Sequence, residues 1–360
     1  MTALLPVADA QTAALLAREL GEVEVIFERQ LASDLPAVNS LCKHVERYRG
    51  KMLRPTLVLA TGLATAGADG SGGRSGEVRS DEGGFDGEAD RRRAAARGTR
   101  GPVSPAHRTV AAVVEMIHMA TLVHDDVLDE ADVRRQGATV NHLRGNEMAV
   151  MLGDYLISNA FHLCSTIGDP RINLFLGETT NTLCEGELVQ LHHRDNLSLD
   201  EATYFEIVRR KTAVLVGACC RLGASLSGAG DEVVDAMRRF GLALGVAFQI
   251  QDDLLDLSGQ PELVGKSLGR DLAKGKLTLP VILHLAGAGP RARSESIELI
   301  ERRDAVALLG RLVDGGSIAS ARERAKALVD DAKSLLDVLA DSPARDLLVA
   351  LSDAIVARER

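Results

Sequence analysis

The sequence predicts an all-α protein, a helical bundle around a central active-site cavity, on three observations. Long stretches such as 9–33 and 231–257 carry apolar residues at helical spacing, three and four apart. Few segments alternate with period two, and aromatic residues make up only 3% of the chain. Two apolar helical stretches end in clusters of aspartates, which indicates that helices surround a polar site. A chain of 360 residues can bury one large core, so we expect a single domain over residues 1–360.

Each helix follows from apolar spacing and from its end residues. Pro36 starts a second helix that should end near Gly50, and the pair Ser198 and Glu201 fits a capping box for a later helix. Beyond Pro280, charged and apolar residues alternate at helical spacing to about residue 358. The other expected helices cover 9–33, about 53–66, a stretch from about 105, 146–167, 171–193 and 231–257.

One segment departs from this pattern. Residues 67–104 are rich in Gly, Ser, Arg and Asp, and their only large apolar residues are Val78, Phe85 and Val103. Such a segment cannot bury enough surface to offset its ordering entropy, so we expect a disordered insertion loop.

Composition excludes several classes of protein. A formal net charge of −9 argues against a nucleic-acid partner. The five cysteines have no metal-ligand spacing and are expected to be reduced thiols. No signal-peptide pattern is seen, and no apolar run reaches the roughly 18 residues of a membrane span. A cytoplasmic protein is expected.

The chain's chemistry is expected at two aspartate motifs. Residues 125–129 read DDVLD, so Asp125 and Asp129 share one face of a helix, with Asp126 beside them. The cluster requires a positive partner, and Mg²⁺ prefers such oxygen ligands. A single motif of this kind could equally be a solvated acidic helix end.

The same spacing recurs after another apolar helix, which favours the metal-binding interpretation. Residues 248–256 read FQIQDDLLD and place Asp252, Asp253 and Asp256 in the first motif's pattern. Two such motifs facing each other across a cavity could hold a shared metal cluster. Basic residues lie between and around them, and acid, metal and base together suit a diphosphate. These basic residues are Lys51, Arg54, Arg134, Arg135, Lys211, Lys266 and Lys276.

The chain carries, in order, the motifs GKMLRP, DDVLD followed by RR, GDYL, KTA, FQIQDD and GKSLGRDLAKGKLTLP. On the order of these motifs it resembles the trans-isoprenyl (polyprenyl) diphosphate synthases, from about Lys51 to the C-terminus. The resemblance implies a homodimeric prenyltransferase of isoprenoid-synthase fold. Its partners would be isopentenyl diphosphate and an allylic diphosphate (geranyl, farnesyl or geranylgeranyl). It would use Mg²⁺, with three ions per site. In the family a short turn usually connects the two helices that residues 67–104 connect in this chain.

The resemblance also assigns roles, motif by motif. Metal ions would be held by Asp125, Asp126, Asp129, Asp252, Asp253 and Asp256. Isopentenyl diphosphate would be bound by Lys51, Arg54, His118 and Arg135, and the allylic diphosphate would be neutralised by Arg134, Lys211 and Lys266. Oxygens of Thr212 and Gln249 would lie near the developing carbocation, and Gln190 is expected to face the cavity.

Product length is predicted from the helix before the first motif. In the resembling family an aromatic residue four or five positions before that motif stops chain growth. Here these positions are Thr121 and Ala120, both small, with Ile117 one turn deeper. We therefore expect products longer than C20, about C30–C50, and transient membrane association for their release.

Two other functions are weighed against this one. A class I terpene cyclase also ionises allylic diphosphates, but it needs no second diphosphate site and usually has an aromatic-rich cavity. A regulatory subunit of a heteromeric synthase would typically lack one of the two motifs.

Overall fold

The structure is a computed structural model that describes residues 9–46, 48, 50–67, 103–134, 137–258 and 269–357. Most of the predicted insertion at 67–104 lies outside these ranges, and so do Arg135 and Lys266. Within the described residues the protein is helical apart from a small antiparallel pair, β1 (Val133–Arg134) and β2 (Gly137–Ala138). The predicted fold class is confirmed.

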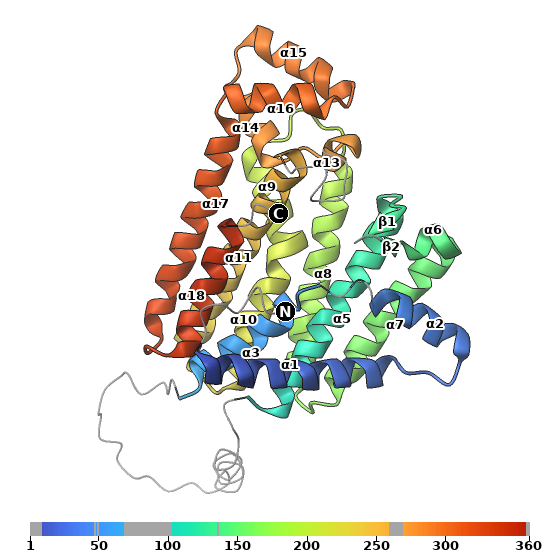
Figure 1. Ribbon diagram of the computed structural model, residues 1–360, viewed down its shortest axis with the longest axis vertical. Coiled ribbons are helices and arrows are strands. Elements are labelled where there is room, and N and C mark those ends of the chain that lie inside the picture. The colour runs from blue at the N-terminus through green and yellow to red at the C-terminus, as the bar shows by residue number, and fades with distance from the viewer. Residues whose placement is uncertain are drawn as a thin grey trace, which may run out of the picture.

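The helices form a bundle, and further helices lie across each of its two ends (Figure 1). Helix α1 (Ala10–Leu31) lies across one end, and the pair α15 (Pro290–Glu301) and α16 (Ala305–Asp314) lies at the other. The elements that carry the site are α5 (Pro105–Leu128), α8 (Pro170–His192), α9 (Glu201–Val208), the π-helical turn η1 (Arg209–Ala213), α10 (Val214–Leu226) and α11 (Asp231–Ser258). The remaining elements are α2 (Pro36–Glu46), α3 (Leu53–Thr65), α6 (Val140–Arg144), α7 (Asn146–Ser165), α13 (Arg270–Ala273), α14 (Leu279–Gly287), α17 (Ser317–Ser334), the 3-10 turn η2 (Leu335–Val338) and α18 (Pro343–Val356).

Helix α5 begins and ends where its sequence favours a boundary. Ser104 caps its N-terminus in a capping box with His107, and Pro105 occupies the first turn. At the other end Asp129 is the C-cap residue, and Glu130 has a positive φ of 47° that turns the chain away. The first aspartate motif therefore lies on the last turn of a long buried helix.

Helix α11 joins two hydrophobic clusters. Its Phe240, Leu244 and Ala247 pack in the larger cluster with α3, α5 and α7. Ile250 and Leu254 pack in a second cluster with α14, α16 and α17. One continuous helix therefore belongs to both clusters.

Helices α10 and α11 pack closely because α11 has glycine at two contact positions, Gly241 and Gly245. A Cβ at Gly241 would lie 2.6 Å from the Val216 carbonyl oxygen, and one at Gly245 would lie 2.5 Å from the Ala213 Cα. Any larger residue would push α11 away from the turn that carries Lys211 and Thr212.

Two local expectations were wrong. Helix α2 ends at Glu46 rather than near Gly50. Helix α9 is capped by Asp200, whose side chain accepts from the Thr203 N–H at 2.7 Å, and not by the predicted box of Ser198 and Glu201. The aspartate lies directly before the first helical residue, so it reaches the free N–H groups that Ser198 cannot.

Candidate active site

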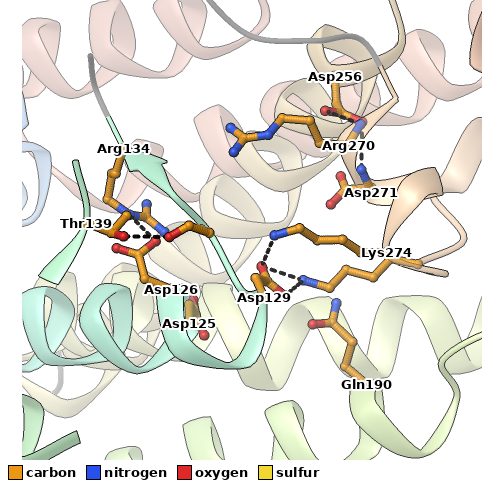
Figure 2. A network of polar contacts seen from close by, with 12 residues as sticks. Asp125, Asp126, Asp129, Arg134, Thr139, Gln190, Asp256, Arg270, Asp271 and Lys274 are labelled. Atoms are coloured by element: carbon orange, nitrogen blue, oxygen red, sulfur yellow. Dashed lines mark hydrogen bonds and ion pairs between the residues drawn. The ribbon is translucent and has the colours of Figure 1, made fainter. Parts of the chain in front are cut away.

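The first motif splits into two environments (Figure 2). Asp126 is buried and accepts from the Arg134 Nε at 2.8 Å, while its backbone oxygen accepts from Asn141. Burial raises the pKa of Asp126 above its usual value, and Arg134 only partly opposes this. Asp125 and Asp129 remain partly exposed, and Asp129 points toward the lysines that follow α13.

Asp129 is surrounded by cations. Its carboxylate accepts from the Lys276 Nζ at 2.8 and 2.9 Å, and the Lys274 Nζ lies 3.4 Å away. Arg194 approaches to 3.9 Å. Burial raises the pKa of Asp129, but Lys276 and Lys274 outweigh burial and hold that pKa below its usual value. The site thus concentrates positive charge beside the first motif.

The second motif also has divided roles. The buried Asp253 accepts from the Tyr204 hydroxyl at 2.6 Å and from the Gln249 side-chain amide at 3.0 Å. Burial and the neighbouring Asp271 raise the pKa of Asp253 above its usual value, and the hydrogen bonds from Tyr204 and Gln249 oppose this shift. Asp256 accepts from the backbone N–H groups of Arg270 and Asp271 at 3.2 and 3.1 Å, which ties α11 to α13 (Figure 2).

The turn η1 presents Lys211 and Thr212 to the same space. The Lys211 Nζ donates to the Gln190 side-chain oxygen at 2.7 Å, forms an ion pair with Glu187 and lies 3.8 Å from Asp125. Burial lowers the pKa of Lys211, but Asp125 and Glu187 outweigh it, so the pKa is raised and the amine is charged.

Gly186 allows this turn to lie against α8. A Cβ there would come within 2.5 Å of the Lys211 backbone nitrogen and 2.8 Å of the Arg210 Cβ. The chain therefore has room for a π-helical turn at RRKTA only because α8 has no side chain at that point. Such single π turns are common at functional sites.

A cavity of about 110 Å³ lies between α8, α9, η1, α11 and the segment before α14. Its lining includes the predicted residues Gln190, Lys211, Thr212, Gln249 and Asp253. The expectation that Gln190 faces the cavity is confirmed. Thr212 donates to the Gln249 side-chain oxygen at 3.0 Å.

Three of the predicted isopentenyl diphosphate residues, Lys51, Arg54 and His118, are described, and they lie at the start of α3 and along α5. Lys51 is exposed, while Arg54 is half-buried near Glu115 and Asp252, whose charges act on it. Burial lowers the pKa of Arg54 despite these acids. His118 lies half-buried on α5.

The residues expected to set product length lie on α5 before the first motif. Ile117 and Ala120 are fully buried, and Thr121 is half-buried, with its hydroxyl donating to the His118 carbonyl.

The donor set suits a hard divalent cation, although the described residues do not hold a ready-made site. Carboxylate oxygens from Asp125 and Asp129 share a space with the cationic lysines. Among the described residues, no group of three or more His, Cys, Asp or Glu side chains lies close enough to hold a metal. Lys211, Lys274 and Lys276 each lie within 4 Å of the Asp125 or the Asp129 carboxylate.

Several site residues were not predicted from the sequence. Asp271 lies near Asp253, Asp256 and Asp129, and burial raises its pKa even though Lys276 opposes this. Glu187, Arg194, Tyr204 and Lys274 contact predicted site residues as described above. Asp271 and Lys274 both fall within GRDLAKGK, beside the predicted Lys276, and that concentration of charge was the available indication.

The helical bundle with two aspartate motifs and a lysine-rich cavity defines a protein of the isoprenoid-synthase class. The family model for polyprenyl synthetase matches residues 36–310. The chain therefore belongs to the polyprenyl synthetase family, and the prediction of a prenyltransferase is confirmed.

Individual relatives agree with this assignment. Octaprenyl diphosphate synthase of Escherichia coli (strain K12) is 32% identical over 351 residues, which cover 96% of this chain and 98% of that protein. Heptaprenyl diphosphate synthase component 2 of Geobacillus stearothermophilus is 32% identical, over 92% of this chain and 93% of the relative. These similarities confirm the expectation of a long-chain trans-prenyl synthase, with products longer than C20.

A solved structure agrees in fold along nearly the whole chain. The polyprenyl synthase of Caulobacter crescentus CB15, complexed with calcium and isoprenyl diphosphate, has a TM-score of 0.82 and 30% identity. The match covers 98% of this chain and 99% of that one.

Proposed function

We propose that this chain is an all-trans polyprenyl diphosphate synthase that joins isopentenyl diphosphate head to tail (1'-4) with an allylic diphosphate, to products of about C30–C50. The observation that carries the proposal is the set of lysines around the first aspartate motif. Lys211, Lys274 and Lys276 all lie within 4 Å of a first-motif carboxylate. A polyanion is the ligand that would compete for these cations.

The residues proposed to hold Mg²⁺, with three ions per site, are Asp125, Asp129 and Asp252. The sequence-based set also contained Asp126, Asp253 and Asp256, whose carboxylates accept hydrogen bonds from the protein. The C. crescentus protein is complexed with calcium and isoprenyl diphosphate, which supports a divalent ion and a diphosphate as ligands of this chain. When bound, Mg²⁺ would offset the charge of the diphosphate and make it a better leaving group.

The cationic side chains of the protein would neutralise the remaining charge of the allylic diphosphate. Lys276 and Lys274 would turn from Asp129 to phosphate oxygens when the allylic diphosphate binds. Lys211, with the predicted Arg134 and Lys266, would add to this neutralisation. Once the diphosphate is bound, these cations would already be in place when the carbon–oxygen bond breaks, so they would stabilise the departing charge without further reorganisation.

Isopentenyl diphosphate is proposed to bind beside the start of α3, through Lys51, Arg54, His118 and Arg135. The negative charge of Asp252 acts on the Arg54 guanidinium, so Arg54 lies near the second aspartate motif. This proximity supports a second diphosphate site next to the first. These residues would position the double bond against the allylic carbon. Such positioning can remove a large part of the activation barrier of a reaction between two substrates. The proton released would pass to the departing diphosphate.

The proposal extends to assembly and location. Large apolar side chains are exposed on α6, α7 and α8, including Leu143, Met148, Met151, Leu174 and Leu188. Their exposure supports a homodimer formed through this surface. No helix in the described part of the chain is both long and apolar enough to cross a membrane. All five cysteines are free, which supports a cytoplasmic location, with transient membrane association on product release.

A second candidate is one component of a two-part synthase, because the G. stearothermophilus relative is named as component 2. The test is to incubate the purified chain alone with Mg²⁺, radiolabelled isopentenyl diphosphate and farnesyl diphosphate. Linear elongated products support the synthase acting alone. Cyclic hydrocarbons contradict it, and no turnover by the chain alone favours the component.

A further inference from the structure

Hydrogen bonds from α9 and, through Gln249, from η1 converge on Asp253 of α11. The Tyr204 hydroxyl donates to the Asp253 Oδ2 at 2.6 Å, and the Gln249 Nε2 donates to the Asp253 Oδ1 at 3.0 Å. The Thr212 hydroxyl donates to the Gln249 Oε1 at 3.0 Å. Both carboxylate oxygens of Asp253 are thus engaged by side chains of the protein.

Burial makes this arrangement firm. Asp253 is 4% exposed and Tyr204 is 5% exposed, so neither side chain can exchange its partner for bulk water. A buried acceptor that loses its donor bears the full cost of desolvation. The Tyr204 hydroxyl therefore holds Asp253 in place, and Asp253 in turn holds the amide of Gln249.

The direction of the amide matters for chemistry in the cavity. With its NH₂ group bound to a carboxylate, Gln249 presents its carbonyl oxygen to Thr212, and both residues line the cavity. The reversed amide would present N–H groups there. Oxygen dipoles stabilise a developing cation, whereas N–H groups oppose it.

We propose that Tyr204 and Asp253 are positioning residues that hold the Gln249 carbonyl toward Thr212 and the reacting allylic carbon, and that Asp253 acts in this way rather than as a metal ligand. This inference rests on the proposed function, since it assigns a use to the same site. It predicts that Tyr204 affects turnover only through Gln249.

The first test is a double-mutant cycle in the full-length protein with isopentenyl and farnesyl diphosphates. Tyr204→Phe should lower kcat about tenfold and leave both KM values within about twofold. In a Gln249→Leu background the same change should cost less than about twofold, because the amide it orients is gone. Tyr155→Phe, on α7, is the matched control with unchanged kcat. Equal losses in both backgrounds would overturn the proposal.

The second test measures metal binding directly. Binding of Mn²⁺ in the presence of inorganic pyrophosphate can be followed by electron paramagnetic resonance. Asp253→Asn should bind within about twofold of the unaltered protein, whereas Asp129→Asn should lose more than about tenfold. A comparable loss in Asp253→Asn would make Asp253 a ligand and overturn the proposal. If the unaltered protein shows no turnover, the proposed function fails, and the Mn²⁺ measurement still decides the role of Asp253.

Discussion

Lys276 and Asp129 form a two-pronged ion pair across 147 positions of sequence, with the Lys276 Nζ 2.8 and 2.9 Å from the two carboxylate oxygens. The pair links the last turn of α5 to the segment between α13 and α14. Both side chains are largely buried, so their charges interact with little screening by water. The amine is held at the place where a diphosphate is proposed to bind.

Lys276→Gln should weaken binding of the allylic diphosphate, because it removes a charge-assisted contact with the phosphate oxygens. We expect the KM for farnesyl diphosphate to rise at least about tenfold. Steady-state kinetics at saturating isopentenyl diphosphate measures this change. Lys326→Gln, at an exposed position on α17, is the control. An unchanged KM in Lys276→Gln would show that this lysine does not reach the diphosphate.

Gly186→Ala should displace η1, since the added Cβ would lie 2.5 Å from the Lys211 backbone nitrogen. We expect kcat/KM to fall roughly 10- to 100-fold and stability to fall by about 1–3 kcal/mol. Gly177→Ala on the same helix is a matched control, since a Cβ there meets nothing within 4 Å. It should retain activity and gain about 0.5–1 kcal/mol from helix propensity. Similar behaviour of both variants would contradict the packing argument.

Sequence and structure agree most closely where local chemistry decides the outcome. The start of α5 follows from Ser104 and Pro105, and the shared face of Asp125 and Asp129 follows from helical spacing. The π turn η1 has no local indication in RRKTA, because it depends on the absent side chain of Gly186 in another helix.

The same limit applies to the aspartates. Asp126 and Asp253 occupy the second position of their motifs. From spacing alone they are assigned to metal binding, like the other motif aspartates. Their actual partners, Arg134 and Tyr204, are set by tertiary packing, in the second case from a residue 49 positions away. Sequence spacing identifies the motif but cannot identify the partner of each carboxylate.

His107 should make stability depend on pH. Its ring is 1% exposed, its Nδ1 accepts from the Ser104 N–H at 3.1 Å, and its Nε2 lies 3.1 Å from the Gly223 oxygen. Burial lowers the pKa of His107 below 6.5, so the unfolded chain takes up this proton first as pH falls. Its contribution is complete above about pH 6.5 and is lost as pH falls toward the lowered pKa.

We therefore expect the free energy of unfolding to decrease between about pH 7.5 and 5.5, with a shallower decrease in His107→Gln. The variant should also lose about 1–3 kcal/mol at the higher pH from its broken buried contacts. Urea denaturation at both pH values measures this, with His192→Gln, an exposed position, as control. Equal slopes in the His107 variant and the unaltered protein would exclude this residue as the source.

Ala120→Phe should shorten the products, because an aromatic ring at this buried position of α5 would obstruct a lengthening chain beside the first motif. The extra volume should also cost about 1–3 kcal/mol of stability. Reversed-phase chromatography of the products measures chain length, and Ala120→Ser is the small-residue control. An active Ala120→Phe variant with unchanged product lengths would contradict the prediction that a small residue at this position permits long products.

The most direct test of the account is the dependence of chain elongation on Mg²⁺ and on both aspartate motifs together. The purified protein is freed of metal with a chelator, and elongation of farnesyl diphosphate is followed as Mg²⁺ is restored. We expect no elongation without metal, full recovery with it, and losses of at least about 10³-fold in both Asp129→Asn and Asp252→Asn. Turnover that survives chelation, or near-normal turnover in either variant, would contradict the claim that the two motifs act on one metal-bound diphosphate.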